Sequence, residues 1–524
     1  MRLRRLLTAA RRAPRAAPNR GAARRGALLL GAVGLAVLGC QNDINITDPN
    51  APSSQTFFKS AGDAQAGVNA TYNALLRLGT FERWQAFSYD LRSDEGTSTS
   101  PWPELQAFVK FQFPSGYNFD INVDTWNDTY TLISRANQVI AYVPSIDMDP
   151  ETRAQLVGEA QFLRGLGYFH LMTLYGGKIP LITTPVAFTD RPASSDSATV
   201  WAQIEKDFSD AATALPISMM TTSGGRASKG AAQGMLGKTL LQQRKWSDAA
   251  DALEPVATGE MGGYDLVPDY ATLFRKEGNN SVESLFEVQM GNETLINTNG
   301  LGGLNISKMV GPCGPSFCDG LPTRWFFDQF MLEQTTTGGV DPRLGATMYY
   351  YKGDTTKVYN KTWAEWAVSD PAKYAARDEL YFKKYGEYYT GSNDQSWEAQ
   401  INYKVLRFAD VLLMYAEALN ESSGPGTAKQ YVDRVRARAG LAPLPGTLDQ
   451  AGMRAAILKE RLLEFGLEGQ RWLDLGRQNL FADLATLKEH DPDFNNFVSG
   501  KTEVLPIPQT ERNLNPNVQQ NPGW

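Results

Sequence analysis

The sequence predicts a mainly α-helical fold of helix hairpins, with a loop-rich, irregular portion inserted before the last pair. Two observations support this prediction. Apolar residues recur every three to four positions over several long segments, which is typical of helices with one buried face. Residues from about 261 to 400 lack this periodicity and are dense in Gly, Asn, Thr and aromatic residues. Because this portion interrupts the helices, we expect no independently folding domains.

Residues 1–39 are organised like a bacterial lipoprotein signal peptide. An Arg-rich start leads to an apolar run over residues 27–38, and the sequence Val-Leu-Gly-Cys ends at Cys40. The run is shorter than the ~20 residues that a helix needs to span a bilayer. We therefore expect cleavage before Cys40 and diacylation of its thiol, so that acyl chains anchor the protein to a membrane. A cleaved secretory signal with an incidental Cys40 is the alternative.

Charge divides the chain at the same point. Nine of its 51 Lys and Arg residues are arginines before Gly26, and no acidic residue precedes Cys40. The remainder carries 42 basic and 57 acidic side chains, a net charge of −15. A protein this acidic is not expected to bind nucleic acid.

The rest of the chain divides into a tether and two regions. Residues 40–58 are polar and contain Asn and Pro, which favours a flexible tether. An N-terminal helical region over 59–260 follows, with an elaborated loop near 80–124; its predicted helices are 60–78, 125–143, 151–176, 199–215, 229–243 and 247–258. The C-terminal region comprises the irregular insertion (about 261–400), a helix pair at 408–421 and 427–439, a long helix at 453–477 and an extended tail to 524.

The predicted helix at 453–477 carries a stripe of carboxylates beside its apolar stripe. Glu460, Glu464 and Glu468 occupy successive i, i+4 positions, where like charges repel, so this stripe needs cations from elsewhere. The candidate cations are Arg461 and Arg471 in the same segment and, as the better candidates, Arg434 and Arg438 just upstream. We expect two packed helices joined by structural ion pairs, with Gly440 ending the first of them.

Four stretches resemble the SusD/RagB family of outer-membrane nutrient-binding lipoproteins. They are EAQFLRGLGYFHLMTLYGGKIPL from Glu159, LRFADVLLMYAEALNE from Leu406, ERLLEFGLEGQRWLDLGR from Glu460 and EVLPIPQTERNLNPNVQQNPGW from Glu503. The resemblance implies a tetratricopeptide-like superhelix of four helix pairs packed against the irregular portion. It also implies a non-enzymatic, cofactor-free protein, anchored in the outer membrane and facing the exterior. Such a protein would bind a glycan or peptide and deliver it to a SusC-like TonB-dependent transporter.

Two other classes of protein are the alternatives, namely a helical-repeat scaffold of the cell envelope and a secreted glycoside hydrolase. A hydrolase needs two carboxyls at a defined separation, which the sequence does not reveal. The two histidines, His170 and His490, are too few and too far apart for a paired-histidine metal motif. A calcium-loop template is matched only in part, by Asp120, Asn122, Asp124 and Asp128, and it fails at its sixth and twelfth positions. We expect no bound metal, and a cap on the second helix is the plainer role for Asp124.

Cysteines and aromatic residues supply the remaining predictions. Cys313 and Cys318 remain after lipidation of Cys40, and a disulfide across CGPSFC is sterically plausible. Tryptophans in the loop-rich segments are candidates to stack on sugar rings; they are Trp84, Trp102, Trp325, Trp363, Trp366 and Trp397. In the SusD/RagB family the loops that follow the first helix contribute to the ligand site. We therefore predict ligand binding at Asp94, Glu95, Trp102, Arg324 and Trp325.

Overall fold

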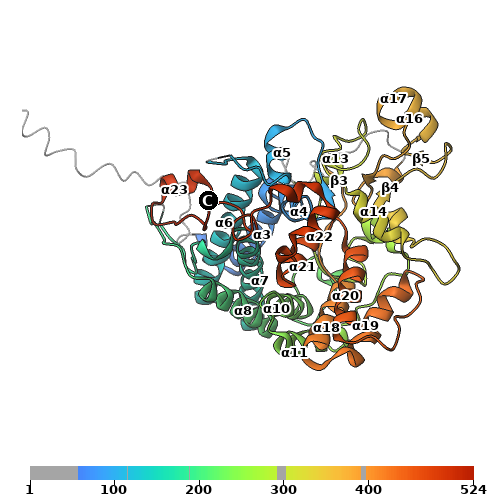
Figure 1. Cartoon of the computed structure of the whole chain (residues 1–524). Coiled ribbons are helices and arrows are strands. Elements are labelled where there is room, and N and C mark those ends of the chain that lie inside the picture. Colours follow the sequence, from blue (N-terminus) through green and yellow to red (C-terminus); the bar gives the residue numbers. More distant parts are fainter. Residues whose placement is uncertain (1–56, 115, 188, 292–301, 391–396) are drawn as a thin grey trace, which may run out of the picture. The chain divides into compact units, whose positions relative to one another are not determined.

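The computed structural model describes residues 57–114, 116–187, 189–291, 302–390 and 397–524 (Figure 1). Residues 58–524 form one compact unit. Residues 1–39, Cys40 and most of the tether lie outside the described residues, so the predictions for them stay predictions. Within the described ranges, every helix is either too short or too polar to cross a membrane.

Eight helices form an array in which each helix packs against the next one (Figure 1). In order they are α3 (Ala61–Asn73), α6 (Asp120–Tyr142), α7 (Pro150–Tyr175), α8 (Ser197–Ala214), α10 (Lys229–Gln242), α11 (Trp246–Ala257), α18 (Phe408–Ser423) and α19 (Pro425–Arg438). They make four pairs, and the irregular portion enters between the third and the fourth. The predicted mainly helical fold with this insertion is confirmed.

Glycines allow the helices of the array to approach closely. A Cβ atom at Gly165 of α7 would lie 3.2 Å from Phe208 of α8, and one at Gly167 would lie 3.0 Å from Ile133 of α6. A Cβ at Gly237 of α10 would lie 2.4 Å from Leu253 of α11. Side chains at these crossings would push the helices apart, so the small residues set the spacing of the array.

Three predicted helices have different boundaries in the structure. The first, predicted over 60–78, ends at Asn73 and is followed by a 3-10 turn over Ala74–Leu76. The second helix starts at Asp120, five residues before the predicted start, so the partial calcium template lies on a helix and Asp124 is no cap. The predicted helix 453–477 is broken into α20 (Gln450–Phe465) and α21 (Arg471–Arg477). In the turn between them Leu467 and Gly469 have φ values of 61° and 71°, which a right-handed helix does not allow. Gly440, with φ of 71°, follows α19 as predicted.

The irregular portion holds short strands and helices. Its strands pair antiparallel with one another or with the outlying strands β1 and β8. The pairs are β1 (Gly96–Thr97) with β3 (Leu321–Pro322), β2 (Ser284–Val288) with β8 (Tyr403–Arg407), β4 (Met348–Tyr349) with β7 (Tyr381–Phe382) and β5 (Lys357–Val358) with β6 (Lys361–Thr362). Strands β2 and β8 are buried along their whole length, and β8 leads directly into α18. This strand pair therefore fixes the insertion to the array.

Short helices complete the fold around these strands. They are α4 (Trp84–Asp90), α5 (Pro103–Val109), α9 (Met220–Ser223), α13 (Ile306–Met309), α14 (Arg324–Met331), α15 (Arg343–Thr347), α16 (Trp363–Ser369), α17 (Pro371–Tyr374), α22 (Leu484–His490) and α23 (Gln509–Leu514). Of these, α4 lies against α21, and α14 lies against α15 and α22. Residues 80–100 are thereby brought next to the turn between α20 and α21.

Candidate functional site

The carboxylate stripe is the centre of a buried ion-pair network. Glu460 and Glu464 are completely buried and Glu468 is 2% exposed. Each of the three carboxylates accepts hydrogen bonds from at least two cationic side chains. Together these cations are Arg343, Arg436, Arg407, Arg438 and Lys384. A buried carboxylate is tolerated only when it is paired in this way. The stripe therefore holds elements together instead of facing a substrate.

Arg407, the last residue of β8, joins three carboxylates. Its guanidinium contacts Glu283 at 2.5 Å, Glu464 at 3.0 Å and Glu468 at 2.7 Å. Burial alone would raise the pKa of Glu464, but Arg438, Arg407 and Arg343 hold that pKa far below its usual range. Glu464 thus stays ionised inside the protein.

The predicted cations of the stripe are only partly those that the structure brings there. Arg438 contacts both Glu464 and Glu283. Arg434 and Arg461 do not reach the stripe. Arg434 pairs with the exposed Asp265 at 2.7 Å, and Arg461 pairs with the buried Asp410 and Asp474. Four cations were missed. Arg436 lies on α19 beside the predicted ones. Arg343, Lys384 and Arg407 come from the irregular portion and from β8, where no local sequence pattern links them to residues 460–468.

Asp94 and Arg471 pair with one another instead of serving the roles predicted for them. Arg471 donates from Nε and Nη2 to the two oxygens of Asp94, at 2.7 and 2.8 Å, and His490 Nδ1 lies 2.8 Å from the same carboxylate. Asp94 is completely buried. Burial would raise its pKa, but Arg471 and His490 lower it to about 2. The prediction that Asp94 bonds a ligand does not agree with this position.

Glu95 is also fully buried, and it faces another carboxyl group. Its Oε1 accepts from the backbone N–H of Leu467 at 3.2 Å, and Asp90 Oδ1 accepts from Gly469 at 2.7 Å. Burial and the mutual repulsion of the two groups raise the pKa of Glu95, and burial raises that of Asp90 to about 7. Glu95 therefore holds a proton at neutral pH, and the two carboxyls together fix the turn between α20 and α21, so Glu95 is not available to a ligand either.

The three remaining candidates are closer to solvent. Trp325 is half-buried and stacks on His490, with ring centroids 3.8 Å apart. One face of the Trp325 indole is therefore already covered. Arg324 is exposed, and its guanidinium lies 5.3 Å from the ring centroid of Phe327. Trp102 is half-buried and packs edge-on against Phe119 at 4.8 Å. The structure does not gather these side chains with Asp94 and Glu95 into one exposed site.

Cys313 and Cys318 form a disulfide, with Cα atoms 4.9 Å apart. The closed loop carries Phe317, whose side chain is 50% exposed, and it precedes the buried Asp319. The bond therefore restrains the backbone beneath an exposed aromatic ring.

An aromatic surface, which we define by Arg83, Trp102, Phe317 and Trp397, is the best candidate for a ligand site. Trp397 is 40% exposed, and its ring lies 5.4 Å from that of Phe317. The guanidinium of Arg83 lies 4.9 Å from the Trp397 ring and 5.1 Å from the ring of Trp84, which in turn is 5.9 Å from Trp102. Exposed aromatic rings beside a fixed cation are suited to stacking and hydrogen bonding.

Sequence reasoning named Trp102 and Trp397 but missed the two other members of this surface. Arg83 and Phe317 lie 234 positions apart in the sequence, and both reach Trp397. The position of Phe317 inside the CGPSFC loop was a usable signal, since a short disulfide loop has no room to bury a large ring. No comparable signal marks Arg83.

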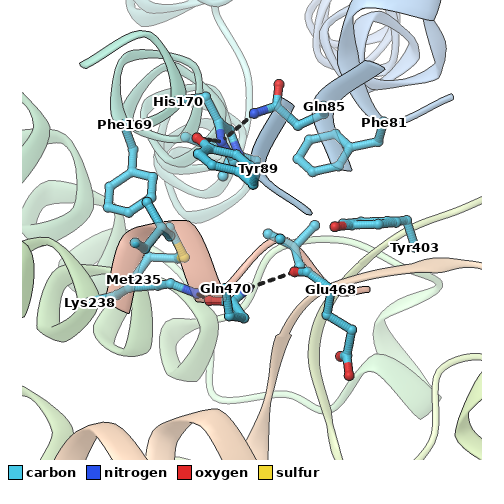
Figure 2. A pocket seen from close by; sticks show the side chains of 14 residues that line it. Phe81, Gln85, Tyr89, Phe169, His170, Met235, Lys238, Tyr403, Glu468 and Gln470 are labelled. Carbon is cyan, nitrogen blue, oxygen red and sulfur yellow. Dashed lines mark hydrogen bonds between the residues drawn. The ribbon is translucent and has the colours of Figure 1, made fainter. Parts of the chain in front are cut away.

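A small internal cavity lies where α4, α7 and α10 meet β8 and α21 (Figure 2). It has a volume of about 20 Å³, enough for one water molecule but not for a sugar. Gln85 lies 2.7 Å from Nδ1 of His170, and Lys238 donates to Gln470 at 2.6 Å (Figure 2). Burial lowers the pKa of His170 to about 3, so the imidazole is neutral. This cavity belongs to the packing of the helices.

The comparisons with known proteins identify the family. The SusD family model matches residues 261–524, and a model described as starch-binding associating with outer membrane matches residues 59–241. The chain therefore belongs to the SusD family. SusD-like protein P2 of Formosa agariphila is 26% identical over 518 residues, which are 94% of this chain and 98% of that protein.

Two solved structures support the same fold. A SusD superfamily protein from Bacteroides vulgatus has a TM-score of 0.78 and 24% identity, covering 90% of this chain and 100% of that one. A laminarin binding SusD-like protein has a TM-score of 0.73 and 27% identity, covering 89% of this chain and 100% of that one.

Proposed function

We propose that this protein is a non-catalytic outer-membrane lipoprotein that binds a glycan and delivers it to a SusC-like TonB-dependent transporter. The observation that carries the binding proposal is the aromatic surface, where Trp397 and Phe317 are exposed beside Arg83. One relative at 27% identity is a laminarin binding protein, which supports a saccharide as the ligand.

The chemistry of this surface suits a sugar ring. The C–H faces of a pyranose stack on an indole or a phenyl ring, and the hydroxyls then need polar partners at the rim. Arg83 donates to Asn305 at 2.7 Å, and Asn305 in turn donates to Glu82 and to the carbonyl of Trp397. This chain of hydrogen bonds holds the guanidinium and the indole in place before a ligand arrives, which reduces the entropy lost on binding.

Carboxylates around Arg83 supply acceptors for hydroxyl groups. Asp120, Asp124 and Asp319 act electrostatically on Arg83, and Asp120 is exposed. Burial, together with Asp120 and Asp128, raises the pKa of Asp124 to about 6. A hydroxyl-rich neutral saccharide can donate to the exposed carboxylate of Asp120 while its ring lies on Trp397.

The absence of catalysis is part of the proposal, and the buried network supports it. Glu460, Glu464 and Glu468 are shielded from solvent and bonded to cations, so they cannot protonate a glycosidic oxygen. A hydrolase would release reducing ends from a glycan that it binds. Incubation with the bound glycan, followed by a reducing-sugar assay, should therefore give no product.

Isothermal titration with laminarin oligosaccharides, other glycans and peptides tests the binding proposal. Trp397→Ala and Phe317→Ala should each weaken the binding of the preferred glycan by about 1 to 3 kcal/mol, or about 5- to 150-fold. Leu332→Ala is the matched control, because Leu332 is 68% exposed and lies outside the aromatic surface. Binding of peptides alone, or wild-type glycan affinity in both aromatic variants, would refute the proposal.

Delivery to a transporter needs a separate test. Affinity purification of the tagged protein from its own outer membrane should recover a TonB-dependent transporter in comparable amount. A scaffold of the cell envelope would recover other envelope proteins and would bind no glycan.

A further inference from the structure

A second cavity, of about 230 Å³, lies between residues 268–275 and α15 and shares no residue with the aromatic surface. Its lining is strongly cationic. Arg275, Arg343, Lys383 and Arg438 contribute to its wall, and Asp269 is the one carboxylate among the lining residues. A cavity with this excess of positive charge attracts anions.

Two of these four cations belong to the buried network and add no net charge. Arg343 is paired with Asp341, Glu460 and Glu464. Arg438 is paired with Glu283 and Glu464. The positive charge available to a ligand must therefore come from Lys383 and Arg275.

Lys383 and Arg275 form no ion pair with a carboxylate in the described part of the chain. Lys383 Nζ donates to the carbonyl of Gly345 at 2.7 Å and lies 4.4 Å from the Tyr388 ring. Lys352 Nζ also approaches Gly345, which places a third cation at the same edge of the cavity. Burial and the like charges of Lys352 and Arg275 lower the pKa of Lys383 to about 8.

The nearby carboxylates are occupied or remote from these cations. Asp269 is exposed and caps the following turn, accepting from Ala271 N at 3.1 Å and from Thr272 Oγ1 at 2.9 Å. Asp269 and Glu277 interact electrostatically with Arg275 but lie too far from it to form an ion pair. The charge of Lys383 is thus offset by aromatic faces and a carbonyl, which are weaker partners than a carboxylate.

Buried donors without acceptors point to the same cavity. Arg438 has a side chain that is 4% exposed, and its Nε–H has no hydrogen-bond acceptor. Nε of Arg275 is likewise buried without an acceptor. Both guanidinium groups line the cavity, and buried donors are normally satisfied by protein or by a bound group.

We propose that this cavity binds an oxyanion, held by Lys383 and Arg275. The volume admits a sulfate or phosphate ion, or the sulfate ester or carboxylate of a substituted sugar. The shared chemistry is a compact group of oxygens with one or two negative charges, which guanidinium and ammonium groups bind through charge-assisted hydrogen bonds. The proposal does not rest on the glycan site, since the two sites have no residue in common.

Titration of the lipid-free protein with sodium sulfate and sodium phosphate, against sodium chloride at equal ionic strength, tests the proposal. Saturable binding by calorimetry and a higher melting temperature are expected for the oxyanions. Lys383→Gln and Arg275→Gln should each weaken that binding at least tenfold. Lys206→Gln, at an exposed lysine of α8 paired with Asp210, should leave it unchanged.

Titration with charged oligosaccharides tests whether the anion is carried on a glycan. A sulfated or uronate-containing oligosaccharide that binds more tightly than inorganic sulfate, and loses that advantage in Lys383→Gln, would show that the anion is carried on a glycan. Trp397→Ala separates the two sites, because it should impair a neutral glycan but not sulfate. Equal responses to sulfate and chloride, or sulfate binding unchanged in both Lys383→Gln and Arg275→Gln, would overturn the proposal even if neutral glycans bind.

Discussion

Asp94 and Arg471 are joined by two hydrogen bonds of 2.7 and 2.8 Å, although 377 residues separate them in the sequence. The pair connects the loop after α4 to the start of α21. Because both side chains are at most 8% exposed, each needs the other to remain charged inside the protein.

The Asp94–Arg471 pair should show strong energetic coupling. Asp94→Ala or Arg471→Ala leaves one buried charge without its partner, which typically costs about 3 to 5 kcal/mol of unfolding free energy. The double variant should cost clearly less than the sum of the two, because it removes both charges. Urea denaturation gives the unfolding free energies of the wild type, the two single variants and the double variant. Strictly additive losses of unfolding free energy would show that the pair is not coupled.

Arg438 and Arg434 provide a matched comparison on one helix. Arg438→Ala should lower the unfolding free energy by several kcal/mol, since it removes one of the cations that neutralise the buried Glu464 and Glu283. Arg434→Ala should cost about 0 to 1 kcal/mol, because Arg434 and Asp265 are 42% and 64% exposed. Thermal unfolding checks this difference: Arg438→Ala should have a lower melting temperature than Arg434→Ala. A loss of glycan binding in Arg438→Ala at unchanged stability would instead make the carboxylate stripe a functional site.

The buried carboxyls of Asp90 and Glu95 predict an unusual pH dependence. Asp90 titrates near pH 7 in the folded protein and near 4 when unfolded, so between these values the folded state binds more protons. Its contribution to stability is therefore greatest at acidic pH and declines as the pH rises from about 4 to about 7. Asp90→Asn, which keeps an acceptor for Gly469, should flatten the unfolding free energy over this window. An equally steep profile in the variant would assign the effect to other groups.

Lipid attachment through Cys40 is tested by membrane fractionation. Cys40→Ser should leave the protein unprocessed or soluble, because a serine hydroxyl cannot accept the thioether-linked lipid. Labelling with a palmitate analogue should mark the wild type only. An unchanged membrane fraction in the variant would mean that another segment retains the protein.

Local patterns in the sequence were sufficient for most helices of the array, although α3 and α6 each differ from prediction by five residues at one end. Apolar periodicity placed α7, α8, α10 and α11 within two residues of their observed ends, because each buries one continuous face. The break between α20 and α21 was missed, since the apolar spacing continues across Leu467 and Gly469 while the backbone does not. Periodicity reports which side chains are buried and not where the backbone reverses.

The candidate sites were harder to predict, because they depend on contacts between distant segments. A pair of acidic residues in a polar loop, Asp94 and Glu95, looks the same whether it faces a ligand or a buried arginine. Only the fold shows that Arg471 and the Leu467 amide lie opposite them. Arg83 reaches Trp397 in the same non-local way, so composition could suggest aromatic stacking but could not select the rings.

The position of the last helix pair determines when the chain can fold as it is synthesised. Helix α18 packs against α11, although residues 258–407 come between them in the sequence. Until α18 has been made, the face of α11 that packs against it has no cover, and until residue 471 has been made Asp94 has no Arg471 to pair with. These contacts of α11 and Asp94 therefore form only after residue 407 has been synthesised. A chain that completes its core this late keeps part of its apolar surface exposed, and accessible to chaperones, while its C-terminal part is being synthesised.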